Sequence, residues 1–129
     1  MVNGPSADEA LRWTRAHAEY AVGLHVNLAH FAPLTDCPRL TRNGRFRGLS
    51  GLVLRQLMDP EGLYQVARVE VAAQLDVFRE TTGRLPSHVD SHLWAQALPA
   101  VFQAVLDVVS AHRIPAVRNI EEQIGRAHV

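Results

Sequence analysis

The chain has 129 residues, of which 47% are hydrophobic and 20% charged, a composition typical of one soluble globular domain. Thirteen basic and 13 acidic residues give a formal net charge of +0, so no global field favours nucleic acid or an anionic membrane. The apolar runs are shorter than the roughly 20 residues of a membrane span, and the N-terminus lacks signal-peptide features. The single cysteine, Cys37, excludes an internal disulfide, is expected to be an ordinary loop thiol, and fits a cytoplasmic protein.

The first half of the chain predicts a helix, a strand and a long loop. Ser6 and Glu9 have the spacing of a capping box, which predicts a helix over residues 6–17. Alternating apolar residues predict a strand over 21–28. Residues 29–48 show no periodicity, and loops of this length often line functional sites.

Helices and strands alternate in the second half. We predict helices over 49–58 and 60–82, the second ending at Gly83, a strand over 87–91, a helix from Pro99, and a last strand over 114–118. This order indicates parallel βα units and an α/β fold. In the long helix, the spacing predicts an apolar stripe against the sheet, with two arginines in water: Val66, Val69 and Leu75 in the stripe, Arg68 and Arg79 outside it.

Two of the predicted strands carry histidines at or near their carboxyl ends. His25 and Asn27 share one face of the first strand, and His88, Asp90 and His92 share one face of the second. Ligands of α/β proteins bind at the carboxyl ends of the strands. Imidazole nitrogens are good ligands for zinc-like ions, so we expect His25 and His92 to share a divalent metal ion, zinc or magnesium, with nitrogens about 3–4 Å apart.

Other polar residues around these strands have two interpretations each. Asp90 is expected to orient a histidine, the alternatives being a metal ligand or a strand cap. The candidate substrate contacts are Asn27, Trp94 and Arg118. The alternatives are a structural role for Asn27, packing for Trp94, and for Arg118 either an orienting contact to an acidic residue or a surface ion pair. Three further histidines, in helix or loop positions, are expected to be solvated and without partners: His17, His30 and His112.

Several short motifs, in this order and spacing, resemble the YdjC-like carbohydrate deacetylases. This family includes chitooligosaccharide deacetylase and hopanoid-biosynthesis-associated relatives. The resemblance extends over residues 1–119. It rests on the strand Gly23-Leu24-His25-Val26-Asn27-Leu28, the loop Gly44-Arg45-Phe46, the helix residues Glu70, Gln74 and Phe78 before Gly83, the run Pro86 then Asp90-Ser91-His92, and Val117-Arg118.

The resemblance implies a fold, a reaction and a partner. The fold would be a partial (β/α) barrel of the polysaccharide-deacetylase kind over residues 1–120, with His25 and His92 as metal ligands. The reaction would be hydrolysis of an N-acetyl amide on a sugar or oligosaccharide, with a metal ion that polarises the carbonyl and activates water, and a carboxylate as general base. The partner would be the N-acetylated sugar, without nucleic acid, and the full-length protein would form a homodimer.

The chain also departs from the family. Relatives open with a strand ending in paired aspartates, a metal ligand and the base, which this sequence does not contain, so we expect a truncated fragment with no catalytic residue of its own. Trp94 and Gln96 stand where relatives tend to carry further histidines. The alternatives are a non-catalytic remnant, or another α/β metal-dependent hydrolase or isomerase that uses the same two histidines.

The last residues have no assigned role. Residues 121–129 are expected to form a tail. Ile124-Gly125-Arg126-Ala127-His128-Val129 reads as the translation of a sequencing-adapter stretch, the alternative being a genuine polar helix end. His128 is therefore given no function.

Overall fold

The computed structural model describes residues 1–118, and the tail predicted over 121–129 lies outside the described residues. The elements, in chain order, are α1 (Ala7–Ala16), β1 (Leu24–Val26), β2 (Thr41–Arg42), β3 (Arg45–Phe46), α2 (Leu49–Met58), α3 (Pro60–Thr82), β4 (Val89–Ser91), the short 3-10 helix η1 (His92–Ala97) and α4 (Pro99–Ala111). The α/β class and the interleaving of parallel strands with helices are confirmed. The described residues form no closed barrel, so the partial barrel stays a prediction.

The N-terminal helix and strand are shorter than predicted. Helix α1 spans Ala7–Ala16, but the Ser6 side chain makes no capping hydrogen bond, so the predicted capping box is wrong. Two acidic residues in the first turn, Asp8 and Glu9, still suit the positive end of the helix. Strand β1 spans Leu24–Val26, the residues that pair in parallel register with residues 89–91.

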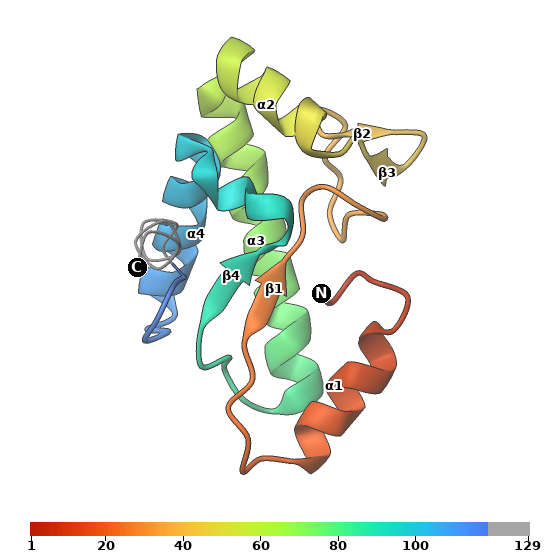
Figure 1. Cartoon of the computed structure of the whole chain (residues 1–129), viewed down its shortest axis with the longest axis vertical. Helices are drawn as coiled ribbons and strands as arrows, with labels where there is room; N and C mark the ends of the chain where they lie inside the picture. The colour runs from red at the N-terminus through yellow and green to blue at the C-terminus, as the bar shows by residue number, and fades with distance from the viewer. Residues whose placement is uncertain (119–129) are drawn as a thin grey trace, which may run out of the picture.

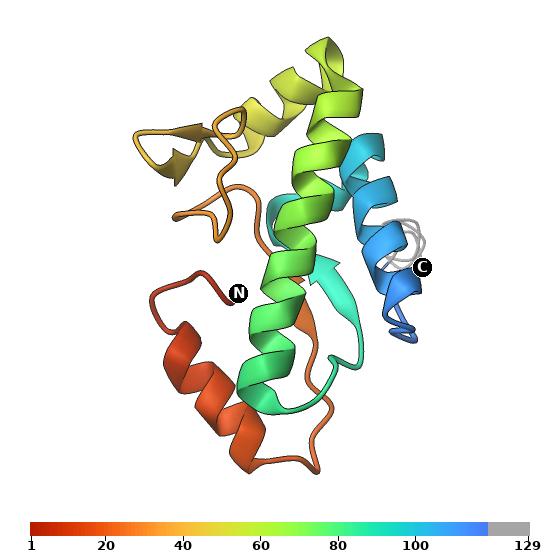
Figure 2. The same cartoon turned by 180° about the vertical axis from the view of Figure 1, so that it is seen from behind.

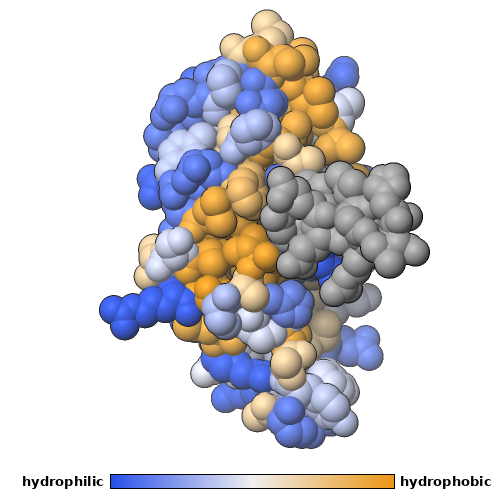
Figure 3. Space-filling model, turned by 60° about the vertical axis from the view of Figure 1, so that its left-hand side comes forward, coloured by the Kyte–Doolittle hydropathy of each residue, from blue (hydrophilic) through white to orange (hydrophobic). Residues whose placement is uncertain are grey.

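The long loop contains a hairpin that the periodicity analysis missed. Strands β2 (Thr41–Arg42) and β3 (Arg45–Phe46) pair antiparallel. Asn43 and Gly44 join them with φ of 53° and 75°, the left-handed conformation that an Asn-Gly turn favours. Helix α2 follows at Leu49–Met58, as predicted. The outer face of α2 is apolar. Figure 3 shows hydrophobic surface, in orange, at the top of the molecule, where α2 ends. The exposed side chains are Val53, Leu54, Leu57 and Met58.

Helix α3 spans Pro60–Thr82, with the predicted end at Gly83. The Asp59 carboxylate caps the start by accepting a hydrogen bond from the Gly62 amide, and Gly83 takes the left-handed conformation, φ 75°, at the other end. Both ends therefore carry a local stop signal, which is why the sequence defined this helix well. Among the described residues, no helix is long and apolar enough to cross a membrane.

The predicted phase of α3 is partly wrong. Leu75 is buried and both arginines are exposed, as expected, but Val69 is 51% exposed and Val66 only half-buried. The buried stripe instead passes through two polar side chains, Glu70 and Gln74, which hydropathy assigns to the surface. The members of the buried stripe are Leu63, Ala67, Glu70, Val71, Gln74, Leu75 and Phe78.

The core lies between the two-stranded parallel sheet and α3. Strand β4 (Val89–Ser91) pairs with β1, and α3 crosses behind them, so that the sheet faces the viewer in Figure 1 and α3 in Figure 2. Helix α4 (Pro99–Ala111) packs on α3. The described residues form no regular strand over 114–118, but Val117 makes an isolated parallel bridge to Val89, with backbone hydrogen bonds at Ala116 and Arg118.

Candidate functional site

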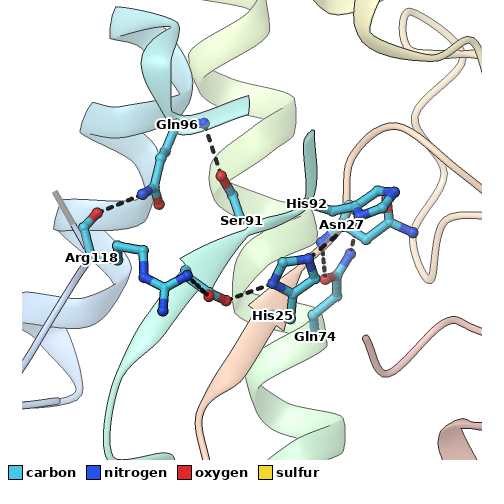
Figure 4. A network of polar contacts seen from close by, with 8 residues as sticks. His25, Asn27, Gln74, Ser91, His92, Gln96 and Arg118 are labelled. Atoms are coloured by element: carbon cyan, nitrogen blue, oxygen red, sulfur yellow. Dashed lines mark hydrogen bonds and ion pairs between the residues drawn. The ribbon is translucent and has the colours of Figure 1, made fainter. Parts of the chain in front are cut away.

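The parallel pairing of β1 and β4 brings the two predicted histidines together. His25 in β1 lies opposite Asp90 in β4, and His92 begins η1 (His92–Ala97) directly after β4. Nε2 of His25 is 3.4 Å from Nδ1 of His92 (Figure 4). The predicted neighbourhood of these two side chains, with nitrogens 3–4 Å apart, is confirmed.

Asp90 contacts the opposite side of the His25 ring. Its Oδ1 is 2.6 Å from Nδ1 of His25, and its Oδ2 is 3.1 Å from Nη1 of Arg118. A carboxylate accepts hydrogen bonds, so Nδ1 of His25 carries the hydrogen and Nε2 keeps a lone pair that faces His92. The contact with His25 is the one expected of an orienting carboxylate. Together, His25 and Arg118 contact both oxygens of Asp90.

A third histidine completes the cluster, and sequence reasoning missed it. Nδ1 of His30 is 2.9 Å from Nε2 of His92, so the expectation that His30 has no partner is wrong. The pKa of His92 is lowered, mainly by burial and further by the positive charge that His30 and His25 would carry and by the N-terminal amino group. The lowered pKa favours the neutral imidazole, which is the form that binds metal ions.

The other two histidines that we expected to be free also have partners, but away from this cluster. Nδ1 of His17 lies 2.8 Å from the Trp13 carbonyl oxygen, and the His17 ring stacks on the Trp13 indole. Nδ1 of His112 lies 2.9 Å from the Val108 carbonyl oxygen. Each contact joins neighbouring turns at the C-terminal end of its own helix, α1 or α4, and needs no functional explanation.

Asn27 forms the turn that brings His30 back to His92. Its Oδ1 accepts from the amides of Ala29 and His30, and its Nδ2 donates to the His30 carbonyl and to Oδ1 of Asn3. The side chain is 0% exposed. Of its two interpretations, the structure gives Asn27 the structural one, because no part of it is open to a substrate.

Two buried polar residues of α3 hold the loop after β1 in place. Gln74 bonds both the amide and the carbonyl of Asn27. The Glu70 carboxylate accepts from the amides of Leu34 and Thr35, at 2.8 and 2.9 Å, and from the Thr35 hydroxyl. The path of the loop beside the histidines is thus fixed by α3, far away in sequence.

Trp94 follows His92 by two residues in η1, and Arg118 contacts Asp90. Trp94 is 53% exposed and, like Leu93, has a positive φ, near 60°, so the core-packing alternative for Trp94 is wrong. A positive φ is uncommon for bulky residues such as leucine and tryptophan, because the side chain crowds the backbone. Arg118 makes the ion pair with Asp90, and its carbonyl accepts a hydrogen bond from the side chain of Gln96. The backbone amide of Gln96 donates to the Ser91 hydroxyl oxygen (Figure 4).

The His25–His92 pair fits a divalent metal ion. Two ligand nitrogens at about 2.0–2.1 Å from one tetrahedral ion are about 3.3–3.4 Å apart, and the observed separation is 3.4 Å. Among residues 1–118, no group of three or more histidine, cysteine, aspartate and glutamate side chains is placed to hold an ion. The described part of the chain therefore offers two imidazole ligands and leaves the other positions of an ion to other groups.

Comparison with known proteins gives a consistent result. A family model described as "YdjC-like protein" matches residues 1–129. A carbohydrate deacetylase of Mus musculus is 35% identical over 93% of this chain, and one of Xenopus laevis is 33% identical over 88%. A chitooligosaccharide deacetylase of Escherichia fergusonii is 35% identical over 81% of the chain. The chain spans 41%, 38% and 40% of the length of these three relatives, respectively.

Proposed function

This chain belongs to the YdjC-like protein family, and from that premise we propose that it forms part of a metal-dependent carbohydrate deacetylase. The enzyme would remove N-acetyl groups from a sugar or oligosaccharide, a hydrolysis of an amide bond. The observation that carries the proposal is the facing pair of imidazole nitrogens, 3.4 Å apart, with Asp90 fixing His25 from behind. The relatives named as deacetylases support the choice of substrate.

In this proposal His25 and His92 hold the ion, zinc or magnesium. When bound, the ion supplies a polarised amide carbonyl and a water of lowered pKa. Asp90 keeps Nε2 of His25 free for the ion, and Arg118 holds Asp90 in place. Trp94, an exposed side chain two residues after His92, would offer an aromatic face for a sugar ring.

The general base is not among these residues. One oxygen of Asp90 contacts His25 and the other contacts Arg118, so we assign Asp90 the orienting role and not that of the base. We propose that the base and a further ligand are the paired aspartates of the family, supplied by chain outside this sequence. Residues 1–120 would then form one part of a (β/α) barrel. The whole protein would be a homodimer.

The experiment is to measure acetate release from N,N′-diacetylchitobiose with added zinc or magnesium. We compare the 129-residue chain, an upstream-extended protein, and the extended protein with His25→Ala, His92→Ala or His17→Ala. We expect little activity from the short chain, because losing a general base typically costs about 10²–10⁴-fold. The extended protein and its His17→Ala control should be active and the other two variants not.

Two results would contradict the proposal. Turnover by the short chain equal to that of the extended protein would mean that Asp90 or another residue present here is the base. Full activity of the His25→Ala and His92→Ala variants would remove the metal site from the mechanism.

A further inference from the structure

His92 has another histidine near each of its two ring nitrogens. Nδ1 faces His25 across 3.4 Å, and Nε2 faces Nδ1 of His30 across 2.9 Å. An ordinary N–H hydrogen bond is about 2.7–3.2 Å long, so the second contact is a hydrogen bond and the first gap is too wide for a good one. The firm contact of the His92 ring is therefore with His30.

We infer that His30 is a positioning residue for His92. The hydrogen bond between Nδ1 of His30 and Nε2 of His92 keeps the other nitrogen, Nδ1, turned toward His25. His25 has the equivalent partner in Asp90, which holds the nitrogen that faces away from the gap. Each of the two rings thus has its own partner on the side opposite the gap, an arrangement typical of metal-binding histidines.

The backbone of His30 is fixed well enough for this role, although its side chain is exposed. Its amide donates to Oδ1 of Asn27 at 3.0 Å, and its carbonyl accepts from Nδ2 of Asn27 at 2.8 Å. Asn27 is itself held to α3 by Gln74. The backbone beside the His92 ring is therefore held by fully buried side chains.

An imidazole suits this position because it can act in either direction. With an ion in the gap, Nδ1 of His92 uses its lone pair, Nε2 carries the hydrogen, and His30 accepts it. Without an ion, His30 can donate to Nε2 instead, by adopting the other tautomer. The identity of the ion rests on the proposed function, whereas the hydrogen bond between the two rings does not.

The test compares three variants of the full 129-residue chain in calorimetric titrations with Zn²⁺. His30→Leu removes the hydrogen bond, and His30→Asn keeps an amide group near the position of Nδ1. His17→Leu is the control, since the His17 ring contacts Trp13, away from this cluster. We expect His30→Leu to weaken zinc binding by about 10–100-fold, as is typical when the partner of a metal-binding histidine is lost. His30→Asn should recover most of the affinity, and His17→Leu should match the parent. Unchanged affinity in His30→Leu, or equal losses in the leucine and asparagine variants, would overturn the inference.

A second measurement reads the His92 ring directly. Ring ¹⁵N spectra at about pH 8, where histidine is neutral, distinguish the two tautomers. In the zinc-bound parent we expect the hydrogen of His92 on Nε2. Even without metal, His30→Leu should shift the His92 resonances and leave those of His112 in place.

These spectra separate the two proposals. A parent chain that binds no zinc would contradict the metal site. The metal-free spectra alone would then decide whether His30 positions the His92 ring. Shifted His92 resonances in His30→Leu would support the inference, and unshifted ones would overturn it. Circular dichroism identical to that of the parent shows that each variant is folded.

Discussion

Replacing Glu70 with alanine should destabilise the chain strongly, because this carboxylate is fully buried and bonds the loop beside the histidines. It accepts four hydrogen bonds, from the two amides at residues 34 and 35, the Thr35 hydroxyl and Nε2 of Gln74. Hydrogen bonds to a charged group contribute about 1.5–3 kcal/mol each, and the contributions of one network do not add in full. We therefore expect a loss of about 3–5 kcal/mol, a large part of the stability of a domain this size.

Urea unfolding followed by circular dichroism measures this loss. Glu70→Gln keeps one carbonyl acceptor and should lose less, while Glu80→Ala, on the exposed face of the same helix, should change the free energy of unfolding by less than about 0.5 kcal/mol. A loss below about 1 kcal/mol in Glu70→Ala would refute the reasoning. It would mean that water replaces the carboxylate and that the loop is not anchored through α3.

Three further predictions test other parts of the structure. A Cβ on Gly23 would lie 2.2 Å from Nε2 of His88, so Gly23→Ala should destabilise by about 1–3 kcal/mol in urea, and much less in a His88→Ala background; equal costs in both would show that the ring is not the obstacle. The hydrogen bond from the Tyr64 hydroxyl lowers the pKa of Asp107, so its contribution to stability is present above the unfolded pKa and is lost as the pH falls through the folded one. Tyr64→Phe should raise that pKa in an NMR titration, and an unchanged titration would contradict the assignment. Burial raises the pKa of the Cys37 thiol to about 11, so a disulfide reagent should modify it slowly in the folded chain and rapidly in urea, and equal rates would contradict its burial.

The sequence predicted the part of the site that depends on local pattern. Strand alternation placed His25 and Asp90 correctly, and the βα order implied parallel strands whose carboxyl ends meet. Helices α2 and α3 have the predicted bounds, and at α3 both ends carry strong signals, Asp59-Pro60 and Gly83. These features follow from residues close together in the chain.

The features that the sequence did not predict depend on distant residues. His30 lies in a loop without periodicity, and only the buried contacts of Asn27 and Gln74 turn it toward His92. Glu70 is polar, so hydropathy assigns it to the surface, although its partners lie 35 and 36 residues earlier. No local pattern contains this information. The Asn43-Gly44 turn, in contrast, is a local sequence signal for a hairpin.

The central claim is that His25 and His92 share one divalent ion, and anomalous diffraction at the zinc edge tests it most directly. In crystals of the chain grown with zinc, we predict an anomalous peak between the two rings, about 2.0–2.1 Å from Nε2 of His25 and from Nδ1 of His92. Asp90 should remain bonded to Nδ1 of His25. A zinc peak that contacts neither nitrogen, or an ion that displaces Asp90 to bind Nδ1 of His25, would contradict the account.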